Sequence, residues 1–386
     1  MSRPGIRFTT IAVTSIVVAY FLGLGSLMAQ HPPGLAPELD PATPYQGYIN
    51  LDREVDTASD VPSMYTQTGD SVPFGGISGI DHLQGSRYLA ISDDRALQGP
   101  ARVYELEIAA GEDFVAKHTD ARITRTIGLT DTHGIPYDRG SVDPESIRVL
   151  PDGTFLWTSE GNTRKAIEAE IIHSSPDGRE LRRFSPPPYH RDFATRRVVK
   201  NNRAYEALAV SRDGQRAVVV TEFPLSQDTE AQQIPAGSSG LSRVTVYDVP
   251  TGQPLSEFVY PLSMELQNTG HPGVSEIIAV NDDATELIFL ERTYGFVAGN
   301  RASLFRVSLD AIAQNTATNV LGKDRLDSKE KPLRKRPIFE FPYLPTHPDN
   351  VESLAWCEGR RDVLFVGSDN NFSSLQRSLL HAVSWR

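Results

Sequence analysis

The chain of 386 residues has almost no cysteine and no excess of positive charge, and both shortages narrow what it can be. Its single cysteine, Cys357, excludes an internal disulfide framework and any metal site made only of thiolates. Because Cys357 lies in the apolar run 354–357, we expect a buried, inert thiol. The net charge of −11 argues against a nucleic-acid-binding protein, which would carry a basic patch.

Several catalytic motifs are also missing. Without a Gly-x-Ser-x-Gly turn, a serine esterase of the α/β-hydrolase type is excluded. Without His-Glu-x-x-His, and with nine scattered histidines, a zinc site is not expected. The chain has neither a phosphate-binding Gly-x-x-x-x-Gly-Lys loop nor a compact calcium loop of alternating acids.

Long hydrophobic runs are absent after residue 29. Before it, Arg3 and Arg7 precede an apolar stretch from residue 8 to about residue 29, which is typical of a signal peptide cleaved after Ala29. The stretch is also long enough to span a bilayer, so an uncleaved membrane anchor is the alternative to a signal peptide in residues 1–29. In both cases we expect the folded part outside the cytoplasm, periplasmic or secreted. The sequence predicts a proline-rich linker over residues 30–44 and one folded domain over residues 45–386.

The chain does contain an internal repeat. Five segments each consist of an apolar run, a turn and a second apolar run, and they span residues 77–94, 144–161, 205–223, 275–292 and 351–370. Two further strand-like runs follow each of the first four segments, giving four strands per unit. Only one run follows the last segment, so the last unit is one strand short. Such a repeat predicts an all-β fold, a β-propeller of four-stranded blades. We count five blades, with six as the alternative, and expect an N-terminal strand to close the ring beside the C-terminal run.

Acidic residues flank the turns of these hairpins. Glu145 and Glu160 lie equally far from the turn at 151–153, so the fold of this hairpin predicts that they face each other. The same reasoning pairs Glu206 with Glu222, Glu276 with Glu291, Glu352 with Asp369, and Ser78 with Asp93.

Opposed like charges destabilise a sheet unless something neutralises them. If these strand ends meet at one mouth of the central channel, they would suit a hard cation such as Ca²⁺, which binds oxygen ligands. The expected ligands are Asp93, Glu145, Glu206, Glu276, Glu291, Glu352 and Asp369. Glu160 or Glu222 would then activate water as the catalytic base. The alternatives are acids that are only solvated or cap turns, acids that take part directly in acid–base catalysis, and local ion pairs with Arg95 and Arg292.

Basic residues could contact the substrate. Arg197 and Arg203 lie in a basic insertion at 185–203, and Arg292 follows one of the acidic positions. Because the arginine fork donates two hydrogen bonds at once, these three side chains are candidates to bind an anionic group. The alternative for the insertion is an ordinary solvated loop.

Two blocks of the sequence are similar to those of a known family. The run Asp143-Pro144-Glu145-Ser146-Ile147 with the turn at 151–153 and Ser159-Glu160-Gly161, and the run from Asn202 to Gly214, resemble the family called esterase-like activity of phytase. The chain departs from the family pattern at three positions where glycine is usual, Ser146, Ala204 and Ala207.

The resemblance extends from about residue 74 to the C-terminus. It implies a propeller with phosphoesterase-like or esterase-like action on a small anionic or ester substrate, assisted by calcium. We expect a monomer. The other readings are a propeller that binds a ligand or partner without catalysis, and an envelope scaffold held by the N-terminal segment.

Overall fold

The computed structural model describes residues 45–57, 71–108, 121–194, 197–199, 203–229, 238–264, 272–295, 299–310, 317–327, 329–341 and 349–384. All of them belong to one compact unit, residues 39–386. The expected leader and linker, residues 1–44, lie outside the described residues. Among the residues it describes, no helix is long and apolar enough to cross a membrane.

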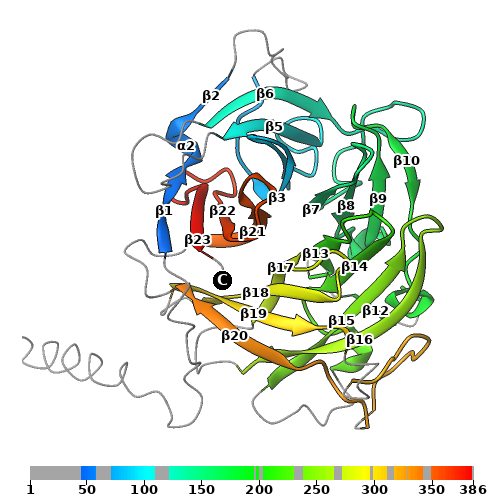
Figure 1. Cartoon of the computed structure of the whole chain (residues 1–386). Coiled ribbons are helices and arrows are strands. Elements are labelled where there is room, and N and C mark those ends of the chain that lie inside the picture. The colour runs from blue at the N-terminus through cyan, green and yellow to red at the C-terminus, as the bar shows by residue number, and fades with distance from the viewer. Residues whose placement is uncertain are drawn as a thin grey trace, which may run out of the picture. The chain divides into compact units, whose positions relative to one another are not determined.

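Five antiparallel sheets surround a central axis and form a five-bladed β-propeller, as the repeat predicts (Figure 1). Blade one contains β3 (Ile77–Gln84), β4 (Arg87–Ser92), β5 (Arg102–Ile108) and β6 (Ala121–Gly128). Blade two contains β7 (Pro144–Val149), β8 (Phe155–Ser159), β9 (Glu170–Ser174) and β10 (Glu180–Arg183). Blade three contains β13 (Tyr205–Val210), β14 (Arg216–Thr221), β15 (Ser238–Asp248) and β16 (Gln253–Ser263).

Blade four contains β17 (Gly273–Ala279), β18 (Glu286–Gly295), β19 (Gly299–Ser308) and β20 (Lys335–Glu340). Blade five contains β21 (Asn350–Trp356), β22 (Val363–Asp369) and β23 (Leu379–Ser384), and its outer strand is β1 (Tyr45–Asn50). A small extra ribbon joins β11 (Arg191–Asp192) to β12 (Arg197–Val198).

The N-terminal strand closes the ring, as predicted. β1 pairs antiparallel with β23 in the last blade. A short helix, α2 (Leu51–Glu54), then leads to β2 (Val55–Thr57), which pairs parallel with β6 of blade one. One N-terminal segment therefore ties the last blade to the first and covers two sheet edges that would otherwise be open.

Apolar faces of neighbouring blades form the core. Between blades three and four, for example, Val218 and Val246 pack in one cluster with Ile277 and Phe289. Such apolar layers between blades explain the alternating pattern of the strand sequences, because successive side chains of a strand point to opposite faces of the sheet. Cys357 is 1% exposed in the cluster between blades five and one, as expected for an inert thiol, and burial raises its pKa.

The inner strands β3, β7, β13, β17 and β21 lie next to one another around the axis and share an irregularity. Each has a register shift against its hairpin partner near its first residues. Such a bulge re-aims a side chain. The directly opposed acid pairs that the turn positions predict are therefore wrong. Asp369, for example, pairs with Asn350, two residues before Glu352.

In blade four, the register shift changes which residue lies at the position equivalent to Glu206. Val274 pairs with Glu291 and Glu276 pairs with Leu290, so Ser275 is the bulged residue. In blade three the bulged residue is Glu206. The predicted Glu276–Glu291 pair is thus wrong, because the blade-four positions equivalent to Glu206 and Glu222 are Ser275 and Arg292.

Candidate functional site

The start of each inner strand and the end of the next strand place three residues per blade around one mouth of the channel. The register and the backbone bonds of these hairpins make the three positions equivalent from blade to blade. In blade order they hold Gly76, Ser78 and Asp93; Asp143, Glu145 and Glu160; Ala204, Glu206 and Glu222; Gly273, Ser275 and Arg292; Asn350, Glu352 and Asp369. We call these residues the axial ring.

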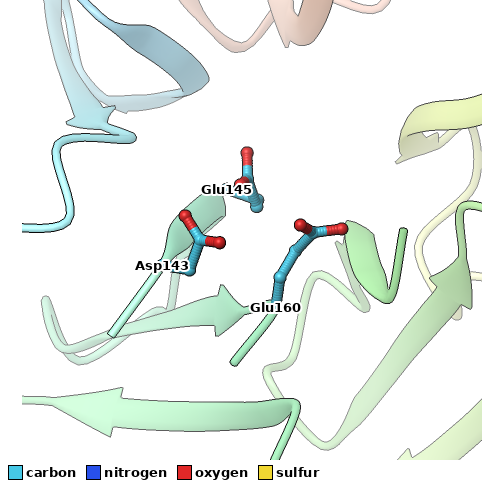
Figure 2. A group of neighbouring side chains, drawn as sticks. All are labelled: Asp143, Glu145 and Glu160. Carbon is cyan, nitrogen blue, oxygen red and sulfur yellow. The ribbon is translucent and has the colours of Figure 1, made fainter. Parts of the chain in front are cut away.

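Blade two supplies three carboxylates to the axial ring (Figure 2). Asp143 precedes β7, Glu145 lies in β7 and Glu160 follows β8, and all three side chains are buried. One oxygen of each lies within 4.8 Å of the others, close enough for one metal ion. Glu160 also forms a second group of this kind with Glu206 and Glu222 of blade three.

Hydrogen bonds orient the blade-two carboxylates. The Ser78 hydroxyl donates to Glu145 Oε2 (2.7 Å), and the Ala204 backbone N–H donates to Glu160 Oε1 (2.7 Å). The Arg95 Nε donates to Asp143 Oδ1 (2.6 Å). Glu160 Oε2 is buried and meets no hydrogen-bond donor from any part of the chain that the structure describes. A buried oxygen in this state calls for a cation or a proton.

Seven carboxyl groups of the axial ring have raised pKa values. Burial, and next the charge of Asp143, raise the pKa of Glu160 to about 8. Burial and Glu206 likewise raise the pKa of Glu222 to about 8. The pKa of Asp143 rises to about 6 through burial although Arg95 opposes the shift. Burial and neighbouring carboxylates also raise the pKa of Asp93 to about 8, and those of Glu145, Glu206 and Asp369 well above their usual range.

Arg292 is the cation that the chain itself supplies to the axial ring. Its Nη2 lies 2.9 Å from Glu206 Oε1 and 3.8 Å from Glu222 Oε1, and its Nη1 pairs with Glu352. Burial alone would lower the pKa of Arg292, but these three carboxylates outweigh it and raise the pKa. The ion pairs of Arg292 therefore join acids of other blades and are not the local pairs considered from the sequence. They engage the guanidinium that was also expected to bind substrate.

Two of the expected ligands lie outside the axial ring. Glu276 lies deeper in the channel, where its Oε2 is 3.0 Å from Arg148 Nη2 and accepts from the Ser146 hydroxyl (2.7 Å). Burial raises the pKa of Glu276 to about 7, against the opposing charge of Arg148. Glu291 points away and pairs with Lys335. Glu291 also accepts from the Ser263 N–H (3.0 Å) and the Tyr260 hydroxyl.

The expected substrate arginines differ in their surroundings. Arg203 lies at the edge of the axial ring, where its Nη1 is 3.2 Å from Glu222 Oε1 and its guanidinium stacks on Phe223 at 4.2 Å. About half of the Arg203 side chain is exposed, so it can also reach a ligand. Arg197 lies in β12, and its side chain lies outside the described residues.

Sequence reasoning missed Asp143 as a site residue and Arg148 as a structural one. Asp143 could have been found, because residues two apart in a strand share a face and Asp143 is two before Glu145. Arg148 gave no such signal. Its guanidinium crosses the axis and donates to the carbonyls of Ile80 (3.1 Å) and Ile277 (2.7 Å), which belong to blades one and four.

Fold and site define a class of protein, a five-bladed propeller with a buried carboxylate cluster at one mouth of its channel. Residues 72–372 match the phytase-like family described as esterase-like activity of phytase. The match covers well over half of the sequence, so the chain belongs to this family.

Other comparisons add little about the reaction. No curated protein matches the chain. Among solved structures, the Dos1 propeller is 8% identical with a TM-score of 0.36, over 83% of this chain and 72% of that one. An endo-arabinase from Bacteroides thetaiotaomicron is 11% identical with a TM-score of 0.41, over 82% of this chain and 98% of that one. We draw nothing about function from likenesses of this degree.

Proposed function

We propose that the protein is an exported, metal-assisted hydrolase of phosphate or carboxylic esters, with the axial ring as its active site. The observation that carries the proposal is the blade-two cluster: three buried carboxylates within reach of one ion, one oxygen of which has no donor among the described residues. All the donors are hard oxygens, the ligand type that Ca²⁺ prefers. The residues present therefore fit the cation that the sequence predicts.

Roles can be assigned within this cluster. Asp143, Glu145 and Glu160 would hold the cation, which when bound would neutralise charge on a phosphoryl or carbonyl oxygen. Glu222 belongs with Glu160 to the second carboxylate group, which does not include Asp143. Its carboxylate is kept partly ionised near neutral pH by Arg292 and Arg203, so Glu222 can accept a proton from the attacking water. Of the two bases expected from the sequence, this geometry favours Glu222.

Arg203 has a positioning role in this proposal. Its stacking on Phe223 fixes the guanidinium at the edge of the axial ring, beside the base. An arginine held in this way can bind an anionic substrate group with its remaining donors. The substrate would then lie across the mouth, between Arg203 and the blade-two carboxylates.

The proposal is tested by a screen of the purified protein against aryl phosphates and aryl carboxylic esters, with Ca²⁺ or with EDTA. We expect turnover of at least one class with Ca²⁺, loss of turnover with EDTA, and recovery when Ca²⁺ is restored. Glu222→Gln should abolish turnover and retain Ca²⁺ binding, whereas Glu145→Gln should lose both. Turnover that is indifferent to EDTA, or full activity in Glu222→Gln, would refute these assignments.

A second candidate is a propeller that binds a ligand without catalysis. The observation in its favour is Arg292, which already neutralises part of the axial ring from within the chain. This candidate predicts a rise in melting temperature with Ca²⁺ and no turnover on either substrate class. The expected export rests on residues 1–29 and is tested by locating the processed chain in cell fractions.

A further inference from the structure

The channel has a second mouth, at the opposite ends of the inner strands. A pocket of about 640 Å³ lies there, within the range of small-molecule sites. Every blade lines it, through the ends of the inner strands and the turns that follow them. No residue of the axial ring is among its lining residues, so the two mouths are separate sites.

Arg148 and Glu276 separate the two mouths. The Arg148 side chain is 2% exposed and forms part of the pocket wall, and its ion-pair partner Glu276 is fully buried. Besides this pair, Arg148 donates to backbone carbonyls of blades one, two and four. This buried ion pair closes the floor of the pocket, so a ligand there could not pass through to the carboxylates.

About half of the pocket wall is apolar. The apolar residues include Leu83 of blade one, Val149 and Leu150 of blade two, Val210 of blade three, Ile278 of blade four and Trp356 of blade five. The Trp356 indole N–H is already bonded to the Ala279 carbonyl (2.8 Å), so the ring offers its apolar surface. These walls suit a flat hydrocarbon or aromatic body.

At the rim of the pocket, two arginines share a carboxylate partner that a ligand could displace. Arg361 Nη1 lies 2.7 Å from Asp282 Oδ1, and Arg212 Nη1 lies 3.6 Å from the same oxygen. The Asp282 and Arg212 side chains are 63% and 73% exposed, so the contacts are solvated and weak. A ligand carboxylate could replace that of Asp282 between the two forks, where the arginines come from blades three and five.

The one carboxylate among the lining residues does not oppose an anion strongly. Asp81 Oδ2 accepts from the Val149 N–H (2.8 Å), which turns it toward the wall. Burial raises the pKa of Asp81 although Arg148 opposes this. Three arginines, Arg148, Arg212 and Arg361, and His82 face it across the pocket lining.

We propose that this second mouth binds a small organic anion, with an apolar body against the five-blade wall and a carboxylate between Arg212 and Arg361. The site is distinct from the axial ring and does not depend on the proposed hydrolase activity. Asp282 acts as an internal competitor for the ligand carboxylate. Because of this competition, substitutions of Arg361 and of Asp282 at the same rim should change the ligand affinity in opposite directions.

The test uses 2-naphthoate as the probe and isothermal titration calorimetry of the purified full chain in EDTA, so that no cation bridges the probe to the axial ring. We expect measurable binding to the wild type, a dissociation constant at least tenfold higher in Arg361→Gln, and one several-fold lower in Asp282→Asn. The uncharged analogue 2-naphthamide should bind more weakly and respond to neither variant. Arg122→Gln, an exposed arginine paired with Glu107 on blade one, is the matched control.

Three results would overturn the proposal. They are no binding of 2-naphthoate to the wild type, equal affinity for 2-naphthamide, or weaker binding in Asp282→Asn. Thermal melts of the variants exclude misfolding as the cause, and Asp282→Asn keeps the test open if Arg361→Gln fails to fold. Ester turnover at the other mouth should be unchanged in both variants, so failure here and failure of the proposed activity are distinguishable.

Discussion

Blades two and four differ in charge at the same three positions of the axial ring. Blade two has Asp143, Glu145 and Glu160, whereas blade four has Gly273, Ser275 and Arg292. On the blade-four side, Arg292 neutralises acids of both neighbouring blades. On the blade-two side, Arg95 pairs with Asp143, and the three carboxylates of that blade lie close together. The difference teaches that one part of the axial ring is neutralised by the chain, whereas the other must be neutralised by protons or by the cation that we propose.

The largest expected effect comes from removing the internal cation. Arg292→Met would leave Glu206 and Glu352 buried without their partner, which typically costs about 3–5 kcal/mol. Urea unfolding of cation-free protein at pH 8 measures this loss. The control, Arg122→Met on the exposed surface of blade one, should change the free energy of unfolding by less than about 0.5 kcal/mol. Equal stability of the two variants would contradict the role given to Arg292.

A matched pair of substitutions contrasts the two sides of the axial ring directly. Glu145→Gln, on the side without an internal cation, should weaken Ca²⁺ binding about 100-fold, which corresponds to about 2.7 kcal/mol. Glu352→Gln removes a carboxylate that Arg292 already neutralises, and we expect a loss below about tenfold. Calorimetric titration with Ca²⁺ gives both values. A larger loss in Glu352→Gln would reverse the comparison.

The third prediction concerns pH. A carboxyl whose pKa is raised in the folded state binds protons more tightly there than in the unfolded chain, so stability falls as pH rises between the two values. For Glu160 and Glu222 the window runs from the usual 4.5 to about 8. Cation-free protein should therefore lose stability steadily from about pH 5 to pH 8, and Ca²⁺ should remove most of this slope. Melting curves that are flat across the window without Ca²⁺ would argue against the raised pKa values.

The smallest expected effect is a shift in a pH profile. Arg203 and Arg292 both hold down the pKa of Glu222 against burial. Because Arg203 is about half exposed, Arg203→Gln should raise that pKa by only about half a unit. The acidic limb of kcat/KM for an aryl ester should move to higher pH by this amount. Arg191→Gln, paired with Glu168 elsewhere on the surface, should leave the limb in place.

The sequence was sufficient for the fold because the repeat encodes it. Apolar alternation around a polar turn recurs in each blade, with Asp-Gly in the turns of blades two and three, and the closing N-terminal strand follows from a last unit that is one strand short. The convergence of Glu145, Glu160, Glu206 and Glu222 also follows, since equivalent strand ends of a propeller meet at one mouth. The metal role of these residues stays a prediction.

The details that failed depend on tertiary geometry. The bulges in the inner strands have no simple sequence signal, and without them Ser275 and Glu276 cannot be told apart as the ring position. Nor does a local pattern show that Arg148 reaches across the axis to the carbonyls of other blades. Both depend on how five separate hairpins meet.

The central claim is that the blade-two side of the axial ring takes up either protons or a cation. Calorimetric titration of Ca²⁺ at pH 7, repeated in two buffers of different ionisation enthalpy, counts the protons released on binding. Because the pKa of Glu160 is raised to about 8 and that of Glu145 well above its usual range, the account predicts release of about one proton or more per ion bound. Binding of Ca²⁺ with the same heat in both buffers, or no binding of Ca²⁺ at all, would contradict it.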